Sequence, residues 1–326
     1  MTTPTLSIRD LTVDIPTRHG VLRPVNGVSY DIAPGEILGV VGESGAGKSM
    51  AGNAVIGLLN PPAHIASGEI HLNGTRIDHL KGDAMRRLRG KDIGMVFQDP
   101  LTSLNPLLKI GDQLTETMLA HLDISAQDAR QRAIAALEEV GIPGASQRVD
   151  SYPHEFSGGM RQRVVIALAL CAEPSLIIAD EPTTALDVSV QAQIIALLKK
   201  LCRERGTAVM LITHDMGVIA EAADRVAVMY AGQLAELGPV REVLAAPVHP
   251  YTDGLMGSTP LASRGKDRLH QIPGAMPRLD ALPTGCAFHP RCPRAQDDCK
   301  QDSGPRIADG AGRAACFHPI TREAVA

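Results

Sequence analysis

The stretch ILGVVGESGAGKS, residues 37–49, decides the fold of this 326-residue chain. Its first five residues are apolar and predict a buried strand, and residues 50–59 after it predict a helix. The glycines between them let backbone N–H groups turn toward an anion, while Lys48 supplies a positive charge and the Ser49 hydroxyl can bind Mg²⁺. A glycine-rich turn with a surface lysine is the alternative. We predict a nucleotide phosphate site formed by Gly42, Glu43, Ser44, Gly45, Ala46, Gly47, Lys48 and Ser49.

The composition limits the classes of partner. Hydrophobic residues make up 44% of the chain, but aromatic residues make up only 2% and Trp is absent, so few side chains can stack on bases. The formal net charge of −4 and the pI near 6.3 offer no attraction for a polyanion. We therefore expect no nucleic-acid partner.

Periodicity along the chain predicts an α/β core. The strands that we expect are residues 6–15, 28–32, 68–72, 93–97, 176–179 and 208–212, with a terminal hairpin at 226–230 and 233–237. Helices are expected within 111–140, as an insertion, and at 190–205. This alternation indicates parallel strands joined by crossover helices. Beyond Pro239 the composition shifts toward Pro, Gly and Cys, and we expect a second, smaller domain there.

Two adjacent carboxylates, Asp180 and Glu181, end the apolar strand LIIA of residues 176–179. At a strand end beside the phosphate loop, Asp180 would bind Mg²⁺ through water and Glu181 would polarise the water that attacks the γ-phosphate. A solvated acidic turn after a core strand is the alternative.

Further polar residues lie at places where open α/β sheets present ligand-binding groups. Gln98 and His214 each follow a predicted strand, although a lone Gln or His is more often a surface or core residue. The stretch SGGMRQ, residues 157–162, places a second glycine-rich turn at the start of a helix, which makes another anion-binding N-terminus. Because one phosphate loop needs no second such site, we expect this turn to face a nucleotide held by another subunit.

Taken together, these segments resemble the nucleotide-binding subunit of an ABC transporter over roughly the first 240 residues. The stretches that carry the resemblance are the phosphate loop, Gln98, FSGGMRQR at 156–163, LIIADEP at 176–182, the turn at 184–187 and His214. FQDPLTSLNP at 97–106, SYPHEFSGGMRQR at 151–163 and HPYTDGL at 249–255 resemble the subgroup that drives oligopeptide and dipeptide import, and this narrower match covers essentially the whole chain.

The resemblance implies an α/β fold: a P-loop NTPase core with a mixed sheet in residues 1–238, a helical subdomain at about 100–160, and a small Cys-rich C-terminal domain in 239–326. Two such subunits would close head to tail around ATP. The resemblance places Ser157 and Gly159 against the γ-phosphate bound across this interface, and it counts Gly158 and Asp187 among the nucleotide-binding residues. Gln98 would contact Mg²⁺, and His214 would steady the γ-phosphate. Ile15 stands where the family usually stacks an aromatic residue on adenine.

The resemblance also implies the partners: two transmembrane permeases, a second ATPase subunit that is a related chain or a second copy, and an extracytoplasmic peptide-binding protein. No apolar stretch approaches the roughly 20 residues that span a bilayer, so we expect a cytosolic chain. The resemblance implies that it binds peripherally at the cytoplasmic face of the membrane. Nickel, opines or glutathione are alternative solutes. A soluble ABC ATPase acting on ribosomes or DNA and a small-molecule kinase are alternative functions.

Four of the six cysteines gather in the tail: Cys286, Cys292, Cys299 and Cys316. In a reducing compartment we expect no structural disulfides, and a loop-rich tail needs a staple. Zinc is one alternative: structural zinc sites favour more closely spaced Cys pairs, but His289 and His318 are also available as ligands. Free thiols that bind no metal are the other alternative. Similar tails in peptide-importer ATPase subunits imply a [4Fe–4S] cluster. Cys171 and Cys202 lie among apolar residues and are expected in the core.

Overall fold

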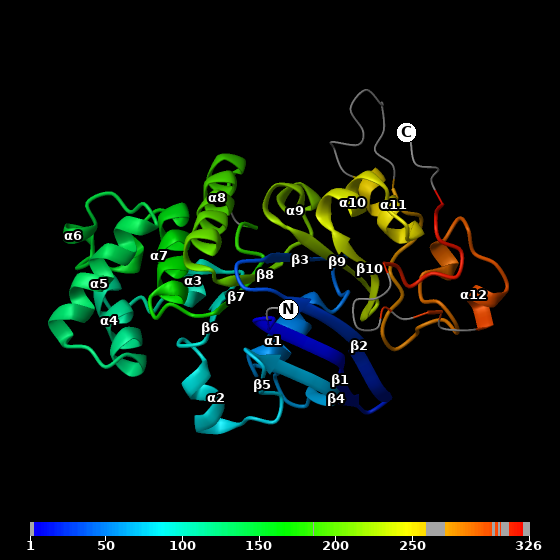
Figure 1. The fold of residues 1–326 in the computed structure, drawn as a ribbon, viewed down its shortest axis with the longest axis horizontal. Helices are drawn as coiled ribbons and strands as arrows, with labels where there is room; N and C mark the ends of the chain where they lie inside the picture. Colours follow the sequence, from blue (N-terminus) through cyan, green and yellow to red (C-terminus); the bar gives the residue numbers. More distant parts are fainter. Residues whose placement is uncertain are drawn as a thin grey trace. The chain divides into compact units, whose positions relative to one another are not determined.

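The computed structural model describes residues 3–184, 186–258, 271–301, 304–305, 307 and 313–321. These residues form two compact units. Figure 1 labels the helices and strands of both. Unit 1 comprises residues 1–33, 37–79 and 212–326, and unit 2 comprises 34–36 and 80–211, as far as they are described. The described residues beyond Pro239 therefore belong to unit 1, and a separate C-terminal domain stays a prediction.

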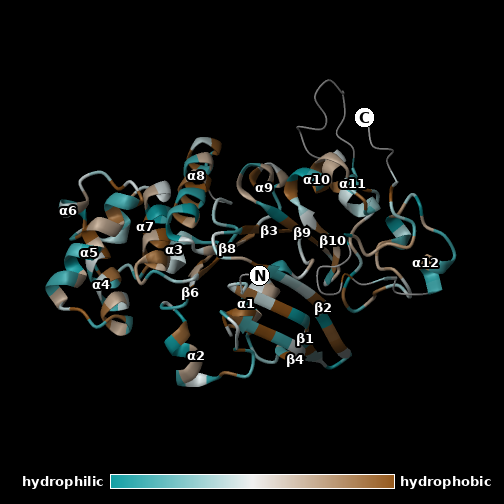
Figure 2. Ribbon diagram, in the orientation of Figure 1, coloured by the Kyte–Doolittle hydropathy of each residue, from teal (hydrophilic) through white to brown (hydrophobic). Residues whose placement is uncertain are grey.

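The first sheet of unit 1 is antiparallel, with the strand order β2-β1-β4-β5. Its strands are β1 (Leu6–Thr17), β2 (Gly20–Ile32), β4 (His64–Leu72) and β5 (Thr75–Arg76). Hydrophobic and hydrophilic residues alternate along β1 in Figure 2, as expected for a strand with one buried face. The predicted strand at 28–32 was too short, because pairing with β1 continues to Gly20 past irregular register at Val25 and Leu22.

The second group of strands in unit 1 has the order β10-β9-β3. Strand β3 (Ile37–Val41) is buried at every residue and runs parallel to β9 (Arg225–Tyr230), which forms the predicted hairpin with β10 (Gln233–Pro239). The helices of unit 1 are α1 (Lys48–Val55), α9 (Met216–Ala222), α10 (Val240–Ala245), α11 (Pro250–Gly257) and α12 (Asp298–Gln301), with a 3₁₀ turn η2 (His289–Arg291). Parallel and antiparallel pairs make the sheet mixed.

Helix α1 differs from the prediction for residues 50–59 at both ends. It begins at Lys48, directly after the glycine loop, and ends at Val55. Gly57 adopts a left-handed conformation, φ 66°, and its N–H bonds back to the Ala54 carbonyl, so the chain leaves the helix before Asn60.

Unit 2 contains three strands in the order β8-β7-β6 and most of the helices. Strands β6 (Ile93–Val96) and β7 (Leu176–Asp180) are parallel, and β8 (Ala208–Ile212) has the predicted bounds. The helices are α2 (Gly82–Leu88), α3 (Pro100–Ser103), α4 (Ile110–His121), α5 (Ala126–Glu139), α6 (Ala145–Arg148), α7 (Gly158–Leu170) and α8 (Val188–Arg205), with a 3₁₀ turn η1 (Pro153–Glu155).

The inserted helices α4, α5 and α7 lie side by side in Figure 1 and pack through small and aliphatic residues. Ala129, Ala133 and Leu137 of α5 are fully buried at a spacing of four residues, which confirms the helical period predicted over 111–140. Cys171 and Cys202 are buried, as expected. Within the described part of the chain, the helices are all too short or too polar to cross a membrane.

Candidate nucleotide-binding site

The phosphate loop leads from β3 into α1 and is shaped around Lys48. The Lys48 side chain is buried, and its Nζ donates to the Gly42 carbonyl at 2.9 Å and to the Glu43 carbonyl at 3.0 Å. The loop therefore curls around the ammonium group and holds a positive charge at the N-terminus of α1. An anion at this end also meets the positive end of the helix dipole.

Two glycines of the loop lie where no side chain fits. Gly42 has a φ of 153°, and a Cβ there would lie 2.2 Å from the Met229 carbonyl oxygen. Gly47 has a φ of 99°, and its Cβ would lie 1.9 Å from the Pro24 carbonyl oxygen. The loop is thus wedged against neighbouring backbone, while its residues Ser44, Gly45 and Ser49 are exposed and can meet a ligand.

His214 and Ile15 belong to the same unit as the phosphate loop. His214 is exposed and follows Thr213, whose N–H bonds to Val40 of β3 at 3.2 Å, so it leaves the sheet beside the strand that enters the loop. Ile15 is half-buried on β1 and pairs with Leu22 of β2. Their contacts with nucleotide stay predictions.

Glu181 and Gln98 meet in unit 2. The Gln98 amide Nε2 donates to Glu181 Oε2 at 3.1 Å, and the Thr184 hydroxyl donates to the same oxygen at 2.8 Å. The two residues follow the adjacent parallel strands β6 and β7, as their position after predicted strands indicated, and Asp180 is the half-buried last residue of β7. Sequence reasoning did not single out Thr184 as a partner of the carboxylate.

The backbone at Glu181 is strained. Its φ of 48° lies in the left-handed region, which costs a residue with a long side chain about 1–3 kcal/mol. Such strain concentrates at functional sites, because the surrounding structure holds a reactive group in one orientation. The hydrogen bonds from Gln98 and Thr184 fix the carboxylate oxygen in addition.

Ser157 and Asp187 cap helices of unit 2. Ser157 Oγ accepts from the Met160 N–H at 3.4 Å and begins α7, so Gly158 and Gly159 form its first turn. Asp187 Oδ1 accepts from the Val190 N–H at 2.9 Å, and this bond, with one from the Ser189 hydroxyl, lowers the pKa of Asp187. Both residues thus have a structural role, and their contact with nucleotide stays a prediction.

The four tail cysteines line one small cavity of unit 1, of about 20 Å³, together with His289 and His318. Burial raises the pKa of Cys286, of Cys292 and, to about 11, of Cys316, and each nearby thiolate raises it further. A Cys299 Sγ, an Asp298 oxygen and a His318 ring nitrogen lie within 4.8 Å of one another. A bound cation would reverse these pKa shifts, because it favours thiolates.

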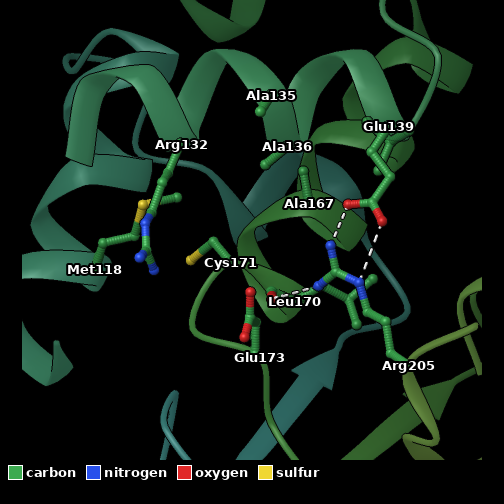
Figure 3. Close-up of a pocket in the computed structure, with 11 residues that line it drawn as sticks. Met118, Arg132, Ala135, Ala136, Glu139, Ala167, Leu170, Cys171, Glu173 and Arg205 are labelled. Atoms are coloured by element: carbon green, nitrogen blue, oxygen red, sulfur yellow. Dashed lines mark hydrogen bonds and ion pairs between the residues drawn. The ribbon is translucent and has the colours of Figure 1, made fainter. Parts of the chain in front are cut away.

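A larger cavity, of about 260 Å³, lies in unit 2 between α4, α5 and α7 (Figure 3). Arg205 lines it, pairing with the Glu139 carboxylate and donating to the Leu170 carbonyl at 3.3 Å. The residues that line this cavity include none of the predicted site residues. We take it as a packing gap beside an ion pair.

Three tail residues contact the phosphate loop although the sequence did not indicate it. Tyr251, Met276 and Arg291 touch Glu43 or Gly45. The HPYTDGL stretch carries a family resemblance, but nothing local in it predicts that Tyr251 contacts Glu43, 208 residues away in sequence.

Comparisons with known proteins agree with this geometry. Residues 25–184 match the ABC transporter family, and residues 235–299 match the family described as the oligopeptide/dipeptide transporter C-terminal region. The chain is 51% identical to the oligopeptide transport ATP-binding protein OppD of Bacillus subtilis, over 87% of this chain and 80% of that protein. It is 42% identical to the dipeptide transport ATP-binding protein DppD of Escherichia coli, over 97% of both chains.

A solved structure is also similar. The dimeric structure of MJ0796, a bacterial ABC transporter cassette, has a TM-score of 0.65 and 29% identity, covering 72% of this chain and 99% of that cassette. The sequence matches and the similar fold thus agree with three features of the site: the glycine loop, the strained Glu181 and the helix α7 capped by Ser157. The chain therefore belongs to the ABC transporter family, as one of its ATP-binding, ATP-hydrolysing proteins.

Proposed function

We propose that this chain is the ATP-hydrolysing subunit that energises the import of dipeptides and oligopeptides across the cytoplasmic membrane. One observation carries the proposal: an intact phosphate loop stands in the same chain as residues 235–299, which match the oligopeptide/dipeptide transporter C-terminal region. The relatives named as oligopeptide and dipeptide transport proteins align with nearly the whole chain, which supports the same role here.

In the mechanism that we propose, the phosphate loop and Lys48 bind the outer phosphates of ATP. The Glu181 carboxylate, oriented by Gln98 and Thr184, accepts the proton of the attacking water. Ser49, Gln98 and Asp180 offer hydroxyl, amide and carboxylate oxygens, the ligand types that Mg²⁺ prefers, and Mg²⁺ neutralises phosphate charge when it is bound.

We propose that the ATP site is completed by a second ATPase subunit, a related chain or a second copy. Ser157, Gly158 and Gly159 would then face the nucleotide on the partner's phosphate loop, and the similar MJ0796 cassette, which is dimeric in its solved structure, supports such pairing. Asp187 and His214 complete the proposed nucleotide contacts, and Ile15 would touch adenine. The ATPase pair would sit peripherally at the cytoplasmic face, on two permease subunits supplied by an extracytoplasmic peptide-binding protein.

Uptake by the intact cell tests the transport function. Deleting the gene in its own host should abolish the uptake of radiolabelled Ala-Ala or Ala-Ala-Ala, because transport stops without its ATPase. The wild-type gene should restore uptake and a Glu181→Gln gene should not. If the deletion strain took up peptides normally but lost the uptake of nickel or glutathione, that solute and not a peptide would be the substrate of the transporter.

We also propose that the tail cysteines hold a [4Fe–4S] cluster. All four cysteines line the same cavity, and four Cys thiolates are the usual ligand set of such a cluster. The competing candidate is zinc, for which Cys299 and His318 lie close enough to share one ion. A cluster bound there would replace the hydrophobic core that a loop-rich segment lacks.

Metal analysis separates the two cofactors. Protein purified without oxygen should be brown, absorb at roughly 400 nm, and contain about four iron atoms and about four sulfides per chain. Changing Cys286, Cys292, Cys299 or Cys316 singly to Ser should remove the colour, whereas Cys171→Ser, a buried cysteine of unit 2, should keep it. Colourless anaerobic protein with one zinc ion per chain would reject the iron–sulfur assignment in favour of zinc.

A further inference from the structure

We propose that Tyr251 and Arg291 are positioning residues for the phosphate loop, and that through them nucleotide binding is coupled to the four-cysteine cavity. The proposal rests on ATP binding at this loop but not on the identity of the solute. The loop and the tail both belong to unit 1, so the proposal concerns contacts within that unit only.

Tyr251 fixes the first peptide group of the loop. Its side chain is fully buried, and its hydroxyl accepts a hydrogen bond from the Glu43 N–H at 2.9 Å. The ring packs against the rings of Tyr230 and Phe288, with centroids 4.6 and 5.4 Å away. Such a ring cannot turn without disturbing its neighbours, so the position of the hydroxyl is preorganised for the loop before a nucleotide binds.

The stretch before Tyr251 anchors it in turn. The Tyr251 N–H donates to His249 Nδ1 at 3.0 Å, which begins helix α11. The buried Glu236 carboxylate of β10 accepts from the N–H groups of Val248 and His249 at 3.0 and 2.9 Å. The His-Pro-Tyr motif thus connects a strand of the core to the phosphate loop.

Arg291 holds the Glu43 side chain. Its side chain is only 7% exposed, and its Nη1 lies 2.9 and 3.1 Å from the two Glu43 carboxylate oxygens and 3.3 Å from the Tyr230 hydroxyl. Its Nε donates to the Pro273 carbonyl at 2.8 Å. A shielded, charge-assisted pair of this kind is stronger than a surface ion pair.

A third contact from the tail reaches the edge of the loop at Gly45, which stays exposed. A Cβ placed on Gly45 would lie 3.1 Å from Met276 Cε, so the methionine lies against this residue of the loop. The tail therefore touches the loop at Glu43 through a hydroxyl and a guanidinium and at Gly45 through an apolar side chain.

The same residues adjoin the cysteine cavity. Arg291 directly precedes Cys292, and Phe288 lines the cavity while packing on Tyr230 and Tyr251. A change in the cavity that moves Phe288 or Arg291 must move the groups that hold Glu43. Because coupling between two binding equilibria is reciprocal, a nucleotide on the loop must also affect the cavity.

Nucleotide affinity of the full chain tests the positioning role. Arg291→Gln should weaken ATP binding by about tenfold, since a shielded ionic hydrogen bond is lost, and Tyr251→Phe by a few-fold, since one neutral bond is lost. Arg291→Lys should restore part of the loss. Arg278→Gln is the matched control, because this tail arginine is exposed and pairs with Asp280 two residues away.

A second readout measures the coupling itself. The as-purified chain is labelled with N-ethylmaleimide with and without ADP, so that each tail cysteine reacts as it becomes free of any bound metal, and the modified cysteines are identified by mass spectrometry. ADP should slow labelling of the tail cysteines several-fold in the wild type and in Arg278→Gln, but not in Arg291→Gln. Wild-type ATP affinity in Arg291→Gln and Tyr251→Phe, or wild-type labelling that ignores ADP, would overturn the proposal. Failure of the wild type to bind ATP would instead reject the phosphate site.

Discussion

Glu181→Gln is expected to lower ATP hydrolysis by a factor of about 10²–10³ while leaving ATP binding intact. The amide keeps the shape of the side chain and can still accept the hydrogen bonds from Gln98 and Thr184 that the carboxylate accepts at 3.1 and 2.8 Å. It cannot accept a proton from water, so the base is lost and the phosphate loop is untouched. Phosphate release and equilibrium ATP binding, measured on the same preparation, separate the two effects.

The matched control is Glu138→Gln, an exposed glutamate on α5 that should hydrolyse ATP at the wild-type rate. If Glu181→Gln also turned over at that rate, the proton would have to go elsewhere and the residue would lose its catalytic role. If the variant lost ATP binding as well, the strained turn at Glu181 would be supporting the fold and not the chemistry.

Gly47→Ala is expected to weaken ATP binding by about 100-fold or more. The new Cβ would lie 1.9 Å from the Pro24 carbonyl oxygen at a residue whose φ is 99°, so the backbone must shift at the point where the loop becomes helix α1. The shift turns N–H groups away from the phosphates and displaces Lys48, which follows directly. Titration with a fluorescent ATP analogue measures the loss, and circular dichroism checks the fold.

Gly206→Ala separates the clash from the backbone preference. Gly206 also has a positive φ, 68°, but a Cβ there meets nothing within 4 Å, so this variant should lose a little stability and keep ATP affinity. Equal losses in both variants would mean that general destabilisation, and not the crowded loop, governs binding.

Local patterns predicted the strands and the polar residues at their ends. The bounds of β8 were correct because five apolar residues stand between a turn and a polar stretch, and Gln98 met Glu181 because each follows one of two adjacent parallel strands. Strand β2 was predicted too short, since Asn26 and Gly27 interrupt its alternation while pairing with β1 continues.

The contacts of the tail could not be predicted in the same way. Arg291 and Glu43 are 248 residues apart, and neither lies in a periodic stretch that would reveal its partner. The caps at Ser157 and Asp187 were local and could have been recognised, because each precedes a helix and has a side chain that accepts from the backbone. The family resemblance instead gave Ser157 and Asp187 only a role in nucleotide binding.

The buried Glu236 limits how this tail can be exchanged between proteins. Its carboxylate is fully buried on β10, and its partners, the Val248 and His249 N–H groups and Arg313, all come from later in the chain. A tail transferred without β10 would bring these donors without their acceptor, and a cassette cut after β10 would leave the Glu236 carboxylate without these partners. An exchange of the tail between proteins must therefore include both Glu236 and Glu43, and Glu43 lies in the phosphate loop, far outside the residues 235–299 that match the C-terminal family.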